Sequence, residues 1–138
     1  MPQYLSLKDY ASNIYSQKMN VDSLWNSYTL ILLKNITLTE RLYHHQVANC
    51  QSNKLSISLF GTIQLNIERT GFLGPIMISY HPLIQGDSIM DIPSSYINQQ
   101  GLLDGVISLS DKKQIFEHYL NKLLPVYEHM ANLCLKDK

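Results

Sequence analysis

The sequence predicts an α+β fold in which long helices flank a small antiparallel sheet. Apolar residues recur at helical spacing near both ends of the chain, whereas the middle alternates apolar and polar side chains as strands do. The gaps between the alternating segments are too short for helical crossovers, so they favour an antiparallel meander of three to four strands. We expect the long C-terminal helix to pack on this sheet.

Composition bounds the number of domains and the kinds of partner. A chain of 138 residues, 45% of them hydrophobic, can build one core and is too short for two ordinary domains. Residues 1–138 are therefore predicted to form a single domain. The 11 Lys and Arg residues balance the 11 Asp and Glu residues, and this weak net field argues against direct binding of nucleic acid.

The sequence predicts a cytoplasmic protein with no membrane partner. Its N-terminal residues lack the basic start and apolar run of a secretory signal. The longest apolar run, Leu30–Leu33, is far shorter than the ~20 residues that cross a bilayer as a helix. Cys50 and Cys134 belong to no metal-ligand pattern, so each is predicted to be a small buried side chain.

A first helix is predicted from Leu7 to Leu32, with Ser6 as its cap and Asn35 as its stop. The spacing allows one continuous helix of about 40 Å or two helices with a break near Asn20. A continuous helix would be longer than a domain this small can cover, so we expect a partner or a second copy to pack along it. Its apolar stripe comprises Leu7, Ala11, Ile14, Val21, Trp25, Tyr28 and Leu32.

A second helix is predicted to follow almost at once. Thr37 and Glu40 have the spacing of a capping box, in which each side chain bonds a free backbone N–H at the start of a helix. The helix is expected to run to about Ala48 and to present Leu38, Leu42 and Val47.

Three strands are predicted in the middle of the chain, with glycines marking the turns between them. The strand limits between Phe72 and Gly101 are not defined by the pattern, because Pro82 and Pro93 remove backbone donors, and scattered isoleucines indicate an edge strand at most. The predicted strands are Leu55–Leu59, Ile63–Ile67 and Ile76–Tyr80.

A final helix is predicted from Asp111 to about Leu135, with Ser110 as its cap. Pro125 removes one helical hydrogen bond, so a kink near Asn121 is expected rather than an end.

The histidines do not form a metal-ligand or catalytic pattern. On the predicted second helix His44 and His45 point about 100° apart, and His118 and His129 lie about 16 Å apart along theirs. No nucleophile motif, phosphate loop or dinucleotide fingerprint accompanies them. The sequence therefore predicts neither an enzyme nor a metal or cofactor site. We interpret His118 as part of the hydrophilic flank of the last helix.

The aromatic residues are more informative, because tyrosines and the single tryptophan concentrate in the predicted helices. Core packing explains most of them, and the alternative is an interface with another protein. The candidate surface for a partner or for self-association as a homodimer comprises Tyr10, Ile14, Val21, Trp25, Tyr28, Tyr119 and Tyr127.

Two stretches resemble the formate hydrogenlyase regulatory protein family: LWNSYTLILLKNITLTERLYHH at 24–45 and LLDGVISLSDKKQIFEHYLNKLLPVYEHM at 102–130. The resemblance extends from near the N-terminus almost to the end and is weakest between Phe72 and Gly101. It implies a negative regulator of formate hydrogenlyase genes in fermenting bacteria, acting against the formate-responsive transcriptional activator. Because the sequence also lacks a catalytic constellation, we expect it to act by binding the activator protein. It assigns no functional residues.

Other functions remain open from the sequence. One is a small-ligand sensor without catalysis, in which Tyr43, His44 and His45 supply polar contacts. A secretion-type chaperone or an assembly subunit is a further alternative, and it rests only on size and on the α+β layout.

Overall fold

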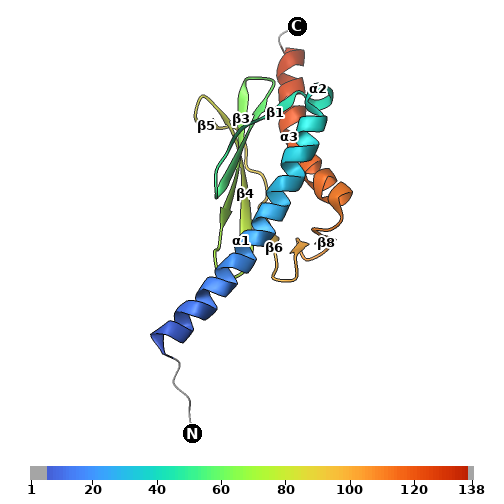
Figure 1. Cartoon of the computed structure of the whole chain (residues 1–138). Coiled ribbons are helices and arrows are strands. Elements are labelled where there is room, and N and C mark those ends of the chain that lie inside the picture. The colour runs from blue at the N-terminus through green and yellow to red at the C-terminus, as the bar shows by residue number, and fades with distance from the viewer. Residues whose placement is uncertain (1–5, 137–138) are drawn as a thin grey trace.

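Two long helices lie along one face of an antiparallel sheet in the computed structural model, which describes residues 6–136 (Figure 1). The helices are α1 (Leu7–Leu38), α2 (Glu40–Tyr43) and α3 (Lys112–Lys136). The strands are β1 (His45–Cys50), β2 (Lys54–Leu59), β3 (Ile63–Thr70), β4 (Ile76–Ile84), β5 (Asp87–Ser88), β6 (Ser95–Ile97), β7 (Leu102–Leu103) and β8 (Ile107–Ser108). The predicted α+β class is confirmed.

The first helix is continuous and longer than predicted. Ser6 caps it, since its hydroxyl accepts from the Asp9 amide while the Asp9 carboxylate accepts from the Ser6 amide. The break considered near Asn20 does not occur. Asn35 does not stop the helix either, because its side chain donates to the Ile31 carbonyl and the helix continues for another turn to Leu38.

The predicted second helix is wrong in its limits. α1 continues through Thr37, whose hydroxyl donates to the Leu33 carbonyl instead of capping a new helix. α2 is a single turn that ends at His44, which has a left-handed conformation with φ 55°. Residues 45–50 then form β1, so the pattern of Leu38 and Leu42, both largely exposed, does not mark a buried helical face.

The sheet has more strands than the three to four predicted. Its order is β1-β2-β3-β4-β6-β7-β8, with β5 paired to β4, and all pairs are antiparallel. The three predicted strands correspond to β2, β3 and β4. β5 to β8 have only two or three residues each, too few to show an alternation in the sequence.

The turn between β3 and β4 depends on glycine, as the sequence predicts for this segment. Gly71 has φ +89°, and a Cβ at this position would clash with the Pro75 carbonyl oxygen. Only glycine therefore fits at this point of the turn, which contacts α1 through Leu73.

One hydrophobic core joins both long helices to the sheet. Trp25, Tyr28 and Leu32 of α1 and Tyr119 of α3 are almost completely buried in it. The inward residues of the central strands complete it: Leu55, Ile57, Leu59, Ile63, Leu65, Ile67, Ile76, Ile78 and Tyr80.

The last helix matches its predicted span but not its predicted cap. The Asp111 carboxylate accepts from the Gln114 amide, whereas the Ser110 hydroxyl bonds to Ser108. The helix continues through Pro125, and Figure 1 shows a change of direction between its orange and red halves.

Both cysteines are exposed, which contradicts their predicted burial. Cys50 ends β1 at the edge of the sheet, and Cys134 lies in the last turns of α3, beyond the core. Among the described residues, no helix has the length and apolar character needed to cross a membrane.

Truncation of α1 tests which of its residues hold the fold. Leu32→Ala should lower the free energy of unfolding by about 2–5 kcal/mol, because it empties a fully buried site. The matched change Leu38→Ala, at a side chain that is 82% exposed, should stay within about 0.5 kcal/mol. Urea denaturation measures both, and similar losses at the two sites would contradict this packing.

Candidate functional site

The first half of α1 extends beyond the sheet (Figure 1). From Leu7 to Asn20 every residue is exposed except Gln17, which is half-buried, whereas burial begins at Val21. Leu7, Tyr10 and Ile14 are spaced as i, i+3 and i+7 and so share one helical face. We call these three residues the exposed α1 stripe.

The candidate surface predicted from the sequence divides in two. Tyr10 and Ile14 are each about half exposed. Tyr127 is half-buried, and its hydroxyl donates to the Tyr43 carbonyl. The other members are buried in the chain's own core: Val21, Trp25, Tyr28 and Tyr119. In the folded chain these four residues offer no surface to a partner, because the sheet and the two helices cover them.

Polar contacts fix the base of the projecting segment to the sheet. The Gln17 amide donates to the Leu73 carbonyl at 2.8 Å, and Asp22 accepts hydrogen bonds from both Arg69 and Lys18. The hydrogen bonds from Lys18 and then Arg69 lower the pKa of Asp22 and keep it ionised. These contacts therefore tie the base of the projecting segment to β3 and to the turn that follows it.

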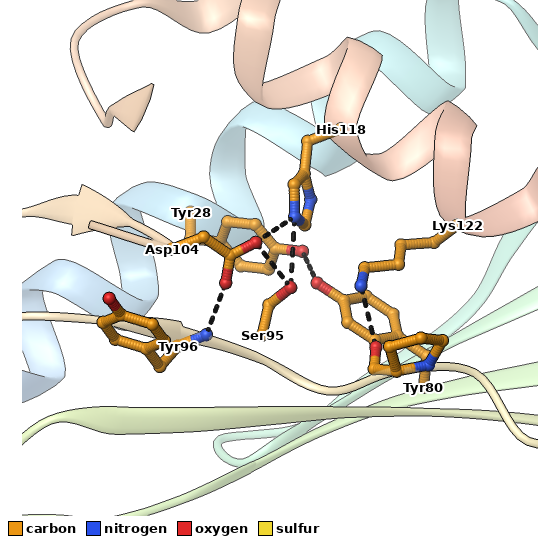
Figure 2. Close-up of polar contacts among 8 residues, drawn as sticks. Tyr28, Tyr80, Ser95, Tyr96, Asp104, His118 and Lys122 are labelled. Carbon is orange, nitrogen blue, oxygen red and sulfur yellow. Dashed lines mark hydrogen bonds and ion pairs between the residues drawn. The ribbon is translucent and has the colours of Figure 1, made fainter. Parts of the chain in front are cut away.

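A second polar group lies between α3 and the β6–β7 region, and Figure 2 shows it. His118 Nε2 is 2.8 Å from Asp104 Oδ2 and 3.1 Å from Ser95 Oγ, and the Ser95 hydroxyl donates to Asp104 at 3.0 Å. Asp104 also accepts from the Tyr96 amide. Ser95 is buried, the His118 side chain is 11% exposed and that of Asp104 is 37% exposed; we call these three residues the buried polar cluster.

Tyrosine and lysine side chains border this cluster. The hydroxyls of Tyr28 and Tyr80 are 2.8 Å apart, and burial is the main reason that the pKa of each phenol is raised. Lys122 lies over the Tyr80 ring and donates to the Pro93 carbonyl at 2.7 Å. The buried Tyr28–Tyr80 bond links α1 to β4, and the half-buried Lys122 links α3 to the same strand (Figure 2).

Burial and hydrogen bonds act in opposite directions on the charge states of the cluster. Burial lowers the pKa of His118, and the neighbouring Asp104 opposes the shift only in part. Burial raises the pKa of Asp104, but hydrogen bonds from His118, the Tyr96 amide and Ser95 outweigh it and bring the pKa below its ordinary value. The arrangement favours a neutral imidazole that donates from Nε2, because the buried Nδ1 has no partner among the described residues.

Serine, histidine and aspartate together invite comparison with a hydrolytic triad. A triad needs the base to contact the nucleophile through one ring nitrogen and the carboxylate through the other. Here Nε2 of His118 contacts both Ser95 and Asp104, and Ser95 is only 1% exposed. The cluster therefore cannot relay a proton from an accessible nucleophile, and its evident role is to hold α3 on the sheet.

Two of the three predicted ligand contacts, His44 and His45, line one cavity of about 320 Å³, whereas Tyr43 lines a different one. His45 is buried, and its two ring nitrogens bond the hydroxyls of Thr39 and Tyr119 at 2.8 and 2.9 Å. Burial lowers its pKa to about 4, so it stays neutral at neutral pH. His44 is exposed and stacks on Phe60, and the Tyr43 ring packs edge-on against His45.

Several structurally important polar residues escape the sequence prediction. Arg69 follows Ile63, Leu65 and Ile67 in the inward phase of β3, so the alternation itself could have shown that its side chain points inward. His118 is mostly buried and not part of a hydrophilic flank, and only the fold brings Asp104 to it.

Comparison with protein families and with curated proteins relates this chain to the same group of regulators. The family model described as a transcriptional repressor of the hyc and hyp operons matches residues 4–138. The chain is similar to the formate hydrogenlyase regulatory protein HycA of Escherichia coli (strain K12) and to that of Shigella flexneri. Each is 24% identical over 125 residues, which cover 90% of this chain and 82% of the relative. No solved structure gives a significant match.

Acid titration of stability tests the buried histidines. Between pH 6.5 and about 4 the unfolded chain binds a proton on His45 that the folded chain does not. The free energy of unfolding should therefore fall as the pH drops through this window, and the lowered pKa of His118 adds a change of the same sign.

Urea denaturation at a series of pH values measures this dependence. His45→Gln should make the free energy of unfolding less dependent on pH between pH 6.5 and about 4, because it removes a group that binds a proton in the unfolded chain but not in the folded chain over this range. The exposed His81, changed to Gln, is the control. An identical pH dependence of the free energy of unfolding in His45→Gln and in the unmodified chain would contradict the lowered pKa of His45.

Proposed function

Because the chain belongs to the family of transcriptional repressors of the hyc and hyp operons, we propose that it represses formate hydrogenlyase genes by binding their formate-responsive activator. In this proposal the exposed α1 stripe is the surface that docks on the activator. The protein acts in the cytoplasm as a binding protein without catalysis.

The single observation that carries the proposal is the uncovered apolar face of α1. Leu7 is 84% exposed, and Tyr10 and Ile14 are each about half exposed. Their i, i+3 and i+7 spacing is that of helices whose apolar face enters a groove on another protein. The partner surface would accordingly be an apolar groove, since burial of these side chains supplies the free energy of binding.

The charges support a protein partner over DNA. The chain has equal numbers of basic and acidic residues, and the projecting part of α1 carries Lys8 and Lys18 together with Asp9. A helix that binds the phosphate backbone directly needs a basic stripe to gain affinity from counterion release. Repression through the activator requires no such stripe.

A charge placed in the stripe tests the proposal. Ile14→Glu should weaken binding of the activator by about tenfold or more, because an apolar anchor becomes a carboxylate that must lose its water. The variant should also lose repression of a reporter driven by the hyc promoter. Pull-down with the purified activator measures binding, and the reporter measures function.

Ser16→Glu is the matched control. Ser16 is exposed on the same helical segment but lies about 160° around the axis from Ile14, away from the stripe. It should retain binding and repression. The proposal fails if the unmodified chain does not bind the activator, or if both variants lose binding equally.

We also propose that the free chain forms a homodimer through the same stripe, because a helical apolar face can pair with its own copy. Binding of the activator would then displace the second copy. Light scattering should give a dimer mass for the unmodified chain and a monomer mass for Ile14→Glu. A monomer mass for the unmodified chain at every workable concentration would rule out the dimer.

A further inference from the structure

A cavity of about 290 Å³ opens where α1 leaves the sheet. Side chains of α1 form one wall, and the turns that follow β1 and β3 form the other. This cavity is distinct from the exposed α1 stripe and from the buried polar cluster.

Arg69 is the unusual member of the cavity lining. Its side chain is only 2% exposed, and its Nη2 donates to Asp22. Nε is buried without a hydrogen-bond partner among residues 6–136. A buried guanidinium with an unused donor is costly, so such a donor usually marks a missing water, ion or ligand.

Phe72 leaves the donors of Arg69 available to a ligand. Its ring covers the guanidinium at 4.9 Å from the centroid. Stacking of this kind covers the flat face of the guanidinium, whereas the N–H groups point outward in its plane. The edge of Arg69 can therefore still pair with a planar anion.

The charges around the cavity do not balance. Arg69 and Lys18 carry two positive charges, and Asp22 carries one negative charge, so one positive charge is in excess. The side-chain amides of Asn26 and Asn53 also line the cavity, and neither donates a hydrogen bond within the described part of the chain. The cavity thus offers one uncompensated charge together with free N–H donors.

We propose that this cavity binds a small carboxylate anion. The in-plane N–H groups of Arg69 match the two oxygens of a carboxylate, and Lys18 supplies a second positive charge at the cavity wall. A monoanion neutralises the single excess charge, whereas a phosphate dianion would leave the site negative. Asn26 and Asn53 contribute amide donors to the bound anion.

The place of the cavity suggests what binding does. Lys18 belongs to the projecting half of α1, and Arg69 precedes the turn that Gln17 already contacts through Leu73. An anion held between them ties the base of the projecting segment more firmly to the sheet. A bound anion would change how the exposed α1 stripe is presented to the activator, and this regulatory consequence rests on the proposed function. The binding of the anion to the cavity does not rest on it.

Titration of the purified chain with formate and acetate tests the site. Sodium chloride holds the ionic strength constant, and NMR follows the Arg69 Nε–H and the amides of Asn26 and Asn53. We expect saturable shifts at these groups with both carboxylates. The proposal is overturned if no saturable shift occurs, if chloride alone gives the same shifts, or if inorganic phosphate binds and the carboxylates do not.

Variants assign the binding to the cavity. Lys18→Met should weaken carboxylate affinity about two- to fivefold, as expected for one partly exposed charge. Arg69→Lys should weaken it about tenfold or more, because an ammonium group cannot pair with both oxygens in one plane. Lys8→Met, an exposed lysine on the same segment but outside the cavity, is the matched control.

Equal weakening of carboxylate affinity by Lys8→Met and Lys18→Met would overturn the assignment of the binding site to this cavity. If Arg69→Lys does not fold, the comparison of Lys18→Met with Lys8→Met tests the assignment alone. The activator is absent from these titrations, so their failure leaves the proposed repression intact. Conversely, failure of the activator pull-down leaves the carboxylate site intact.

Discussion

The central constraint on this structure is that α1 is longer than the sheet it covers. A helix of 32 residues spans about 48 Å, whereas the longest strand, the nine-residue β4, spans about 30 Å. The apolar stripe of α1 nevertheless continues along nearly its whole length. Where the sheet is present the stripe buries Trp25, Tyr28 and Leu32, and where the sheet ends it leaves Leu7, Tyr10 and Ile14 uncovered. The core and the candidate interface are therefore two parts of one helical face.

Polar contacts inside the fold determine how that face is held. The buried polar cluster fastens α3 to the short strands β6 and β7, where there are too few apolar residues to hold the backbone by burial alone. In the same row of the sheet, where Arg69 of β3 and Ser95 of β6 both pair with Ile78 of β4, Asp22 and Arg69 join α1 to β3. The base of the projecting half of α1 is thus fixed to β3.

The parts of this fold that show a clear period are the parts that the sequence predicts. Helical spacing identifies α1 and α3, and alternation identifies β2, β3 and β4. The segment from Thr37 to Cys50 is predicted wrongly, because Leu38 and Leu42 mimic a buried face and the left-handed turn at His44 has no glycine to mark it. The two- and three-residue strands are too short to carry a period at all.

The candidate site is predictable to the same extent. Surplus apolar surface on α1 follows from the length of the helix, so the sequence identifies Tyr10 and Ile14 as exposed. Periodicity alone cannot tell where the sheet ends. Val21, Trp25 and Tyr28 are therefore assigned to the surface in error. The pairing of Asp22 with Arg69, and of Asp104 with His118, joins residues far apart in the sequence and appears only in the fold.

Hydrogen exchange of the chain with and without the purified activator tests the central claim most directly. If the uncovered face of α1 is the functional surface, the amides of residues 7–20 should become strongly protected in the complex relative to the free chain at a concentration at which it is monomeric, since this segment has little tertiary cover in the monomer. Protection confined to α3 or to the strands, with residues 7–20 unchanged, would contradict the account.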